Sequence, residues 1–440
     1  MSITRRRALQ LSGAAALLGL TGIPARAEDT GGEILRQWYK VVLHLVRHTA
    51  TYSPPVASRA FAYLGVAAYQ AVASGSTSLV SLAGQLNGLV ELPPRDPKKQ
   101  YSDALITHCV MASAVKTFFG NTGPTGQRVM AAAEKKLKGE ALKGLSPQVI
   151  EASLAYGETL KAAIIDWSST DGGAVIENMG FPMDYPVSKE SGHWHPTSAI
   201  RQQQFPLLPK WGQNRTFAMP SGTSCGLPPP AAYSEDPNSD FFKQAKDVYD
   251  VTTHLTPEQI AIARFWSDDP MLSPTPPGHW IAIASDLLED RKASLDESAE
   301  VMMRLGVAMA DGFIGCWNAK YQYDYVRPVT AIKKLIDPKW EPTLITPPFP
   351  EYPSGHSTES GAAAAVLASI YGDTFAFTDK THVRDGLGER QFPSFQAAAN
   401  EAGISRLYGG IHFRPAIDQG LAQGRCIAQF AIGLRTRSAA

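Results

Sequence analysis

The sequence has no surplus of charge of either sign. Its 440 residues include 41 lysines and arginines and 41 aspartates and glutamates, so the formal net charge is zero. A nucleic-acid-binding protein normally carries a basic excess that complements the phosphate backbone. The balance therefore excludes nucleic acid as the expected partner. Internal repeats and low-complexity stretches are also missing, which argues against a repeat architecture.

Long apolar runs are scarce as well. After the N-terminus, no run reaches the roughly 20 residues that span a bilayer, so we expect no membrane span. At the N-terminus, Thr4-Arg5-Arg6-Arg7 precedes a short apolar stretch from Gly13 to Ile23, and Ala25-Arg26-Ala27 fits a cleavage site. The paired arginines indicate twin-arginine export. We therefore predict that residues 1–27 are a cleaved export signal and that the mature protein is periplasmic or secreted.

Cysteine is rare. The chain has four cysteines, at positions 109, 225, 316 and 426, and they form no CxxC pair. This spacing does not support a zinc site. Export makes a disulfide possible, but the spacing leaves the pairing open. Cys316 lies beside Trp317 in an apolar stretch and is expected to be a buried small residue.

Hydrophobic residues make up 44% of the chain and recur mainly at helical spacing, whereas strand-like alternation is scarce. We therefore predict an all-α fold, a large helical domain built from packed helix bundles and joined by long Pro/Gly-rich loops. The expected helical segments are 33–48, 55–74, 100–119, 124–139, 146–168, 240–268, 279–291, 294–320, 355–371 and 416–435.

Composition also suggests an internal division. Between residues 170 and 235 the chain is rich in Pro, Gly, Ser and Gln, which is typical of an ordered excursion or linker. We interpret 28–235 as an N-terminal helical half that includes this excursion, and 236–440 as a C-terminal helical half. A second proline-rich stretch, 338–353, is expected to form one wall of a site in the C-terminal half.

Three short segments in the last third of the chain carry the chemistry. They are Lys320 followed by Arg327-Pro328, then Pro353-Ser354-Gly355-His356, then Ser405-Arg406 with His412. Together they supply three cations, a hydroxyl, a glycine turn and two histidines. A tetrahedral oxyanion needs such surroundings, because cations balance its charge while hydroxyl and backbone N–H groups bind its oxygens. The segments therefore predict an oxyanion site.

Local structure supports that prediction. An apolar, alanine-rich stretch follows His356, so Ser354 and Gly355 are expected at a helix N-terminus, where unpaired N–H groups attract anions. If the preceding helix continues from Lys320 to Arg327, the seven-residue spacing places both cations on one face. Taken singly, each segment is more often a helix cap, a solvated face or a structural histidine.

The three segments resemble the signature of the superfamily that contains type 2 phosphatidic acid phosphatases and vanadium-dependent haloperoxidases. The resemblance implies that vanadate, or phosphate in the same place, is bound by Lys320, Arg327, Ser354, Gly355 and Arg406. It also implies that His412 bonds the vanadium axially and that His356 is the acid–base residue. The catalytic residues implied are thus His356, His412 and Lys320.

Further features favour the haloperoxidase branch. Trp317 and Phe349 look like the aromatic residues on the halide side of soluble members, although either could be an ordinary core aromatic. Segments resembling bacterial members occur over most of the mature chain: 54–59, 194–197, 211–213 and 276–280. One position departs from the phosphatase pattern, since Ala416 stands where an aspartate orients the last histidine. Asp418 or a backbone carbonyl could replace that aspartate.

The resemblance implies an enzyme that oxidises a halide with hydrogen peroxide to hypohalous acid, which then halogenates a small organic acceptor. The alternative is a soluble acid phosphatase, in which His412 attacks phosphorus to form a phosphohistidine and His356 protonates the leaving oxygen. The preferred halide, the organic acceptor and the oligomeric state stay open.

Overall fold

The protein is all-α, as the sequence predicts. The computed structural model describes residues 30–198 and 201–438, so the predicted export signal lies outside the described residues. The α-helices are α2 (Thr30–His48), α3 (Pro54–Ala73), α4 (Asp103–Phe118), α5 (Pro124–Ala141), α6 (Pro147–Ser169), α7 (Gly173–Ile176), α8 (Asp240–Thr253), α9 (Pro257–Phe265), α10 (Thr275–Asp290), α11 (Leu295–Tyr323), α12 (Pro328–Leu335), α13 (Gly355–Tyr371), α14 (Phe395–Tyr408) and α15 (Arg414–Ile432).

Short elements complete the fold. The described residues include three 3-10 turns: η1 (Arg201–Gln204), η2 (Trp211–Gln213) and η3 (Val383–Asp385). The two strands of the described part, β1 (Phe377–Asp379) and β2 (Arg390–Phe392), pair antiparallel, with Phe377 opposite Phe392. Among the described residues, no helix is both long and apolar enough to cross a membrane.

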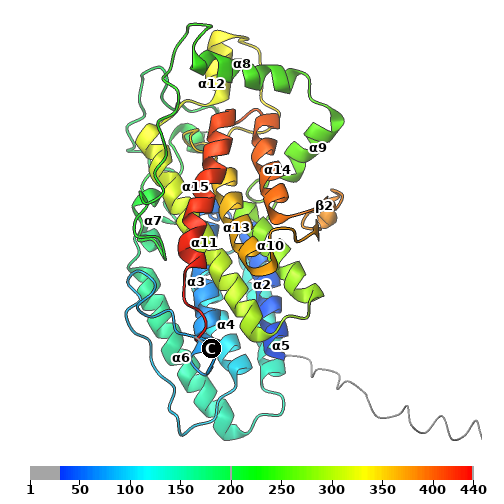
Figure 1. Ribbon diagram of the computed structural model, residues 1–440. Helices are drawn as coiled ribbons and strands as arrows, with labels where there is room; N and C mark the ends of the chain where they lie inside the picture. The colour runs from blue at the N-terminus through cyan, green and yellow to red at the C-terminus, as the bar shows by residue number, and fades with distance from the viewer. Residues whose placement is uncertain (1–29, 199–200, 439–440) are drawn as a thin grey trace, which may run out of the picture.

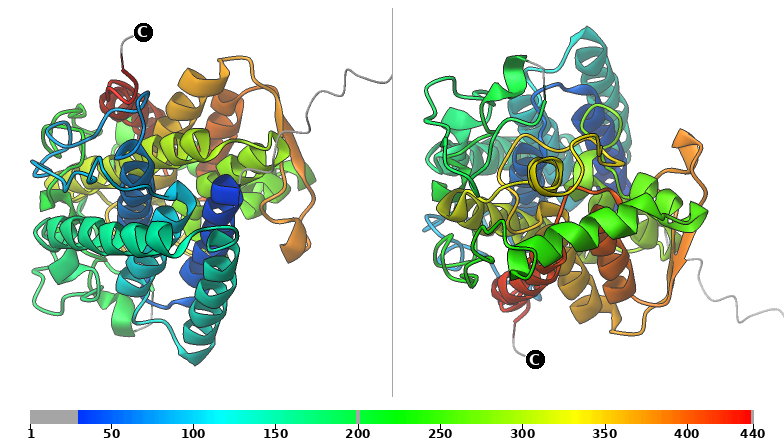
Figure 2. Two further views of the ribbon diagram at one scale, coloured as in Figure 1. Left: turned by 90° about the horizontal axis from the view of Figure 1, so that it is seen from below. Right: turned by 90° about the horizontal axis from the view of Figure 1, so that it is seen from above.

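The long helix α11 lies at the centre of the molecule and packs against both groups of helices. On one side it contacts α2 and α3, which in turn pack against α4, while α5 and α6 pack on α4. On its other side it contacts α13 and α15, with α14 packed on both of these. Figure 1 shows α5 and α6 at one end of the molecule and α8 and α12 at the other, and Figure 2 gives the views along that axis.

Small residues allow these helices to approach closely. A Cβ added to Gly65 on α3 would lie 2.7 Å from Cα of Met303, and one added to Gly306 on α11 would lie 2.6 Å from the carbonyl oxygen of Phe61. At the crossing of α13 and α15, a Cβ added to Gly424 on α15 would lie only 1.9 Å from the carbonyl oxygen of Thr358 on α13. The backbones therefore touch at both crossings, which leaves no room for a methyl group.

The structure differs from the expected helices in several places. The expected helix 240–268 is two helices, because Thr256 caps a new helix with a reciprocal hydrogen-bonded pair to Gln259 and Pro257 begins it. Helices α12 and α14 were not expected at all. Helix α11 does not continue to Arg327, since it ends at Tyr323 with Asp324 in the left-handed conformation (φ 44°).

The excursion before α8 is tied to the C-terminal helices. Cys225 forms a disulfide with Cys426 on α15, across 201 residues of sequence. Cys109 and Cys316 are free and buried, as expected for Cys316. The division into two halves at residue 235 stays a prediction.

Candidate active site

The N-terminus of α13 provides the backbone part of the site. Ser354 is the N-cap, and its Oγ accepts a hydrogen bond from the N–H of Ser357 at 3.3 Å. The N–H of Ser354 donates to the carbonyl of Ala416 at 3.0 Å, which fixes this end of the helix against the start of α15. Gly355 and His356 follow as the first helical residues, as predicted, so their N–H groups lie at the positive end of the helix dipole.

Lys320 and Arg327 meet although they do not share a helix. Lys320 is in the last turn of α11, and Arg327 is the N-cap of α12. The turn at Asp324 brings both cations over the ring of Phe349. Lys320 Nζ lies 5.1 Å and Arg327 Cζ 4.9 Å from the ring centroid. The aromatic face partly offsets the loss of water around two buried charges.

Lys320 is completely buried and is held by backbone oxygens. Its ammonium group donates to the carbonyls of Pro350 (2.8 Å), Glu351 (2.9 Å) and Pro353. Burial lowers its pKa to about 7, and the neighbouring Arg327 also lowers it. Because three carbonyls occupy the three N–H donors, Lys320 contributes mainly charge in this conformation. A direct bond to an anion would replace one of these contacts.

Arg327 has one donor without a partner. Its Nε donates to the carbonyl of Phe349 (2.8 Å) and its Nη1 to the carbonyl of Ile411 (2.9 Å). Nη2 is buried and has no hydrogen-bond partner within the described part of the chain. Burial lowers the pKa of this guanidinium to about 10. An unpaired buried donor costs free energy, so an anion beside Nη2 would be stabilised.

Glu351 orients His412, and the sequence did not reveal this residue. The Nδ1–H of His412 donates to Oε1 of Glu351 at 2.9 Å, and the N–H of Phe413 donates to the same oxygen at 2.9 Å. The ring therefore presents the lone pair of Nε2, which faces Nη1 of Arg327 at 3.2 Å. Burial and the adjacent cations hold the pKa of His412 well below its usual value, so the ring stays neutral.

The departure at Ala416 is explained by this contact. Ala416 is buried and supplies a carbonyl to Ser354, whereas the carboxylate that the last histidine needs comes from Glu351, 61 residues earlier in the chain. Glu351 is itself fully buried, and burial raises its pKa to about 7, against the effect of Arg327 and Lys320.

Arg406 and His356 form the opposite side of the site. Arg406 lies in the last turn of α14, where its Nη2 donates to the carbonyl of Trp266 (2.6 Å) and its Nε to Oγ of Ser405 (3.0 Å). Its Nη1 lies 3.3 Å from Nε2 of His356. Burial and then the charge of Arg406 hold the pKa of His356 well below its usual value. Neutral His356 is therefore ready to accept a proton.

A cavity of about 870 Å³ opens onto these residues. Gly355, His356, Arg406 and His412 line its floor together with the rings of Phe313, Trp317 and Phe349. Trp317 is fixed by a hydrogen bond from its indole N–H to the carbonyl of Leu207 (3.2 Å), and its ring lies 5.0 Å from that of Phe349. Lys320, Arg327 and Ser354 are buried behind this surface.

The mouth of the cavity is apolar. Four of its lining residues are large hydrophobic side chains that are largely exposed to solvent: Met179, Met183, Leu272 and Ile345. These four residues come from three stretches that are far apart in the sequence, and the fold brings their apolar side chains together at this opening. Such a gathering is typical of a binding site for an organic molecule.

The residues present suit an oxyanion with one bond to His412. The site combines the Nε2 lone pair of His412, which faces Arg327, with an unpaired guanidinium donor, a helix N-terminus and three buried cations. All nine residues predicted from the sequence are brought together: Trp317, Lys320, Arg327, Phe349, Ser354, Gly355, His356, Arg406 and His412. The one carboxylate that touches His412, Glu351, was missed.

Comparison with known proteins places the chain in a family. Residues 300–439 match the model of the second helical-bundle domain of vanadium chloroperoxidase. The crystal structure described as the first bacterial vanadium-dependent iodoperoxidase is 38% identical, with a TM-score of 0.84, over 92% of this chain and 97% of that one. The protein therefore belongs to the vanadium-dependent haloperoxidases.

Two further proteins share part of the sequence or the fold. The vanadium chloroperoxidase of Curvularia inaequalis is 28% identical over 27% of this chain, and the match spans about a quarter (24%) of that protein's length. A holo-type bacterial vanadium-dependent chloroperoxidase has the same fold, with a TM-score of 0.65 and 16% identity over 87% of this chain and 93% of that one.

Proposed function

We propose that the protein is a vanadate-dependent haloperoxidase that converts hydrogen peroxide, a halide ion and a proton into hypohalous acid and water. The observation that carries the proposal is the state of His412: its pKa lies well below the usual value, Glu351 orients its ring, and its Nε2 lone pair faces Arg327 among three buried cations. A neutral imidazole with one free nitrogen is what a metal ion requires of a histidine ligand.

His412 would hold the vanadium, while Arg327, Arg406, Lys320 and the N-terminus of α13 would balance the charge on the vanadate oxygens. When bound, vanadate supplies a Lewis acid that activates hydrogen peroxide towards attack by a halide. His356 accepts the proton that hydrogen peroxide loses on binding, through Nε2. Trp317 and Phe349 form an apolar wall on the side from which a halide enters. Phosphate, which has the same shape and charge, would compete for the site.

The cavity supports a role for an organic acceptor. Its volume falls in the range of small-molecule sites, and its mouth is apolar while its floor carries Arg406 and the two histidines. We propose that a neutral organic molecule enters this opening and is halogenated there or close to it.

We also propose that the protein is exported, on the basis of the predicted twin-arginine signal at residues 1–27. The disulfide between Cys225 and Cys426 supports this location, because disulfides form and persist in oxidising compartments such as the periplasm.

The test is a halide-oxidation assay on purified protein with hydrogen peroxide, with and without added vanadate, using iodide and bromide in turn. We expect vanadate-dependent oxidation of iodide at the least, because iodide is the easiest of these to oxidise. No turnover of iodide would overturn the proposal. Hydrolysis of a chromogenic phosphate ester that vanadate inhibits and His412→Ala abolishes would instead support the phosphatase.

A further inference from the structure

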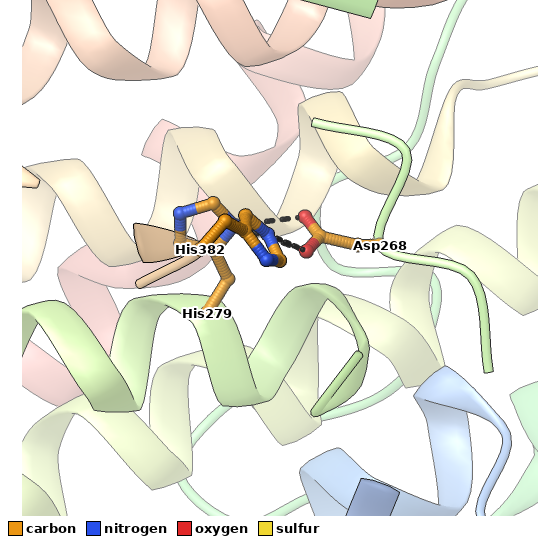
Figure 3. A group of neighbouring side chains, drawn as sticks. All are labelled: Asp268, His279 and His382. Carbon is orange, nitrogen blue, oxygen red and sulfur yellow. Dashed lines mark hydrogen bonds and ion pairs between the residues drawn. The ribbon is translucent and has the colours of Figure 1, made fainter. Parts of the chain in front are cut away.

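A second cluster of titratable side chains lies behind His356. Asp268, in the loop between α9 and α10, faces both His279 on α10 and His382, which follows β1 (Figure 3). Its carboxylate oxygens lie 3.0 Å from Nδ1 of His279 and 3.1 Å from Nε2 of His382. All three side chains are buried, with exposed fractions of 2%, 0% and 4%.

Each histidine of the cluster faces a carboxylate with both ring nitrogens. Nε2 of His279 lies 2.7 Å from Asp379, and Nδ1 of His382 lies 3.0 Å from Asp385. Ionised carboxylates only accept hydrogen bonds, so both nitrogens of each ring carry a proton and both rings are imidazolium ions. Burial opposes the charge on His279, but Asp268 and Asp379 raise its pKa to about 10. Burial likewise opposes ionisation of Asp268, yet the two imidazolium ions hold its pKa below the ordinary value.

The same three side chains could in principle hold a metal ion, since one ligand atom from each lies within 4.8 Å of the others. A metal-binding imidazole must present a lone pair, however, and all four ring nitrogens already have a carboxylate acceptor. The full set of hydrogen bonds therefore favours a network of buried ion pairs.

This network touches the catalytic histidine. Oδ2 of Asp268 lies 4.0 Å from Nε2 of His356, the same nitrogen that faces Arg406. The positive charge of His279 also acts on His356, and His412 lies close enough to interact with it. Glu359 lies one turn further along α13. Glu359 is completely buried, neither of its oxygens has a hydrogen-bond partner among the described residues, and burial raises its pKa well above the ordinary value. Burial therefore disfavours the ionised form of Glu359.

Asp269 follows Asp268 in the chain, but its pKa is shifted in the opposite direction. Burial raises its pKa, although Arg406 counteracts this. The negative charge that faces His356 therefore comes from Asp268. A carboxylate at 4.0 Å stabilises the protonated imidazole, and its two imidazolium partners both fix its position and offset part of its charge.

We propose that Asp268 is a positioning residue for His356, which stabilises the proton that His356 accepts, and that His279 and His382 hold Asp268 in place and limit its effect. The inference rests on the proposed function, in which His356 is the proton acceptor. If the inference holds, Asp268 and His382 have opposite effects on the pKa of His356. Loss of the carboxylate makes His356 harder to protonate, whereas loss of the positive His382 makes it easier.

The direct test is a titration of His356 in vanadium-free protein by NMR, with histidine labelled at Cε1 with ¹³C and the signal assigned by its absence in His356→Gln. The titration is recorded with saturating inorganic phosphate, whose charge offsets the cations and raises the pKa of His356. We expect Asp268→Asn to lower that pKa by about one unit, as for the loss of an ion pair at this distance. His382→Gln should raise it by a smaller amount.

The same variants have a second readout in the peroxidase assay. Because His356 must be neutral to accept a proton, activity is lost as the pH falls through its pKa. The acidic limb of the pH profile should move to lower pH in Asp268→Asn and to higher pH in His382→Gln. Asp247→Asn, which removes a carboxylate from an exposed ion pair with Arg414, is the matched control and should move neither readout.

Shifts in the same direction, or no shift in either variant, would overturn the proposal, as would a divalent metal ion that copurifies in equal proportion with the protein and is lost in His382→Gln. If Asp268→Asn does not fold, the direction in which His382→Gln shifts the pKa of His356 tests the proposal by itself. The NMR titration needs no halide oxidation, so an inactive enzyme with the expected shifts would contradict the proposed function and leave this inference standing.

Discussion

At the scale of single residues, the site is built from three cationic side chains that the fold itself buries. Burial lowers the pKa of Lys320 to about 7 and those of Arg327 and Arg406 to about 10. Each shift means that burial destabilises the charged form of the side chain. A bound oxyanion reverses that destabilisation, and affinity for the anion follows from the cost of burying the cations.

The two histidines should separate vanadate binding from turnover. His412→Ala removes the only predicted bond from the protein to vanadium, so tight vanadate binding should be lost. His356→Ala removes a proton acceptor, so vanadate should stay bound while turnover falls by about 100-fold or more. Equilibrium dialysis against vanadate, followed by the peroxidase assay, measures both effects. Retention of vanadate by His412→Ala together with its loss in His356→Ala would reverse the assignment.

Glu351 should control the affinity of His412 for vanadium. Glu351→Ala removes the acceptor that fixes the Nδ1–H tautomer, and we expect vanadate affinity to fall by about 10- to 100-fold, as for other residues that orient metal-binding histidines. Glu351→Gln keeps an acceptor oxygen for Nδ1–H and for the N–H of Phe413, so most of the affinity should survive. Equal losses in the two variants in equilibrium dialysis would contradict this role.

The residues that touch the anion could be predicted because they lie in short segments with fixed spacing. Glu351 could not, since its link to His412 depends on how the proline-rich stretch before α13 passes the start of α15, and sequence spacing does not encode that approach. The signal was nevertheless present as an acidic residue in a stretch already expected to form a wall of the site. Asp268 could not be predicted either, because its contacts with His279 and His382 depend on how the loop before α10 packs against the segment after β1.

At the scale of helices, the site is assembled from helix ends. Lys320 ends α11, Arg327 caps α12, Ser354 caps α13 and Arg406 ends α14. The N-terminus of α13 could be predicted from an apolar run after a Ser-Gly pair. The break between Lys320 and Arg327 could not, because Asp324 adopts the left-handed conformation that glycine usually supplies. Helix α14 was missed since its apolar and polar residues do not alternate strongly around the helix.

The crossing of α13 and α15 should tolerate no added methyl group. Gly424→Ala would place a Cβ 1.9 Å from the carbonyl oxygen of Thr358, so the helices must separate, at a cost of about 1–3 kcal/mol or more. Gly139→Ala on α5 is the control, because nothing lies within 4 Å of its added Cβ. That change should stabilise by about 0.5–1 kcal/mol. Thermal unfolding of both variants measures the contrast, and an unchanged Tm in Gly424→Ala would show that the crossing adapts.

At the scale of the whole molecule, distant parts of the chain are joined around α11. The all-α class could be predicted from periodicity alone. The packing of α3 against α11 could not, because it depends on Gly65, which lies against Met303, and on Gly306, which lies against Phe61. The pairing of cysteines was likewise out of reach, since four cysteines without local pattern allow several connections.

The disulfide should be a large contributor to global stability. Replacing both Cys225 and Cys426 by serine releases a constraint across 201 residues, and we expect a loss of about 2–5 kcal/mol in the free energy of unfolding. Chemical denaturation with and without reductant measures it, and the double variant should no longer respond to reductant. Cys109→Ala, which changes a buried free thiol, serves as the control and should keep the response. Equal stability of the oxidised and reduced protein would contradict the prediction.

The apolar mouth of the cavity carries a chemical risk for the molecule. Met179 and Met183 stand exposed where any product leaves, and a thioether reacts with hypohalous acid to give a sulfoxide, a halide ion and a proton. These two side chains would then meet the oxidant before bulk solvent does. Each molecule of hypohalous acid that leaves without reacting with an organic acceptor would make part of the cavity mouth polar instead of apolar. Oxidation of the methionines at the cavity mouth would therefore accumulate with the number of turnovers.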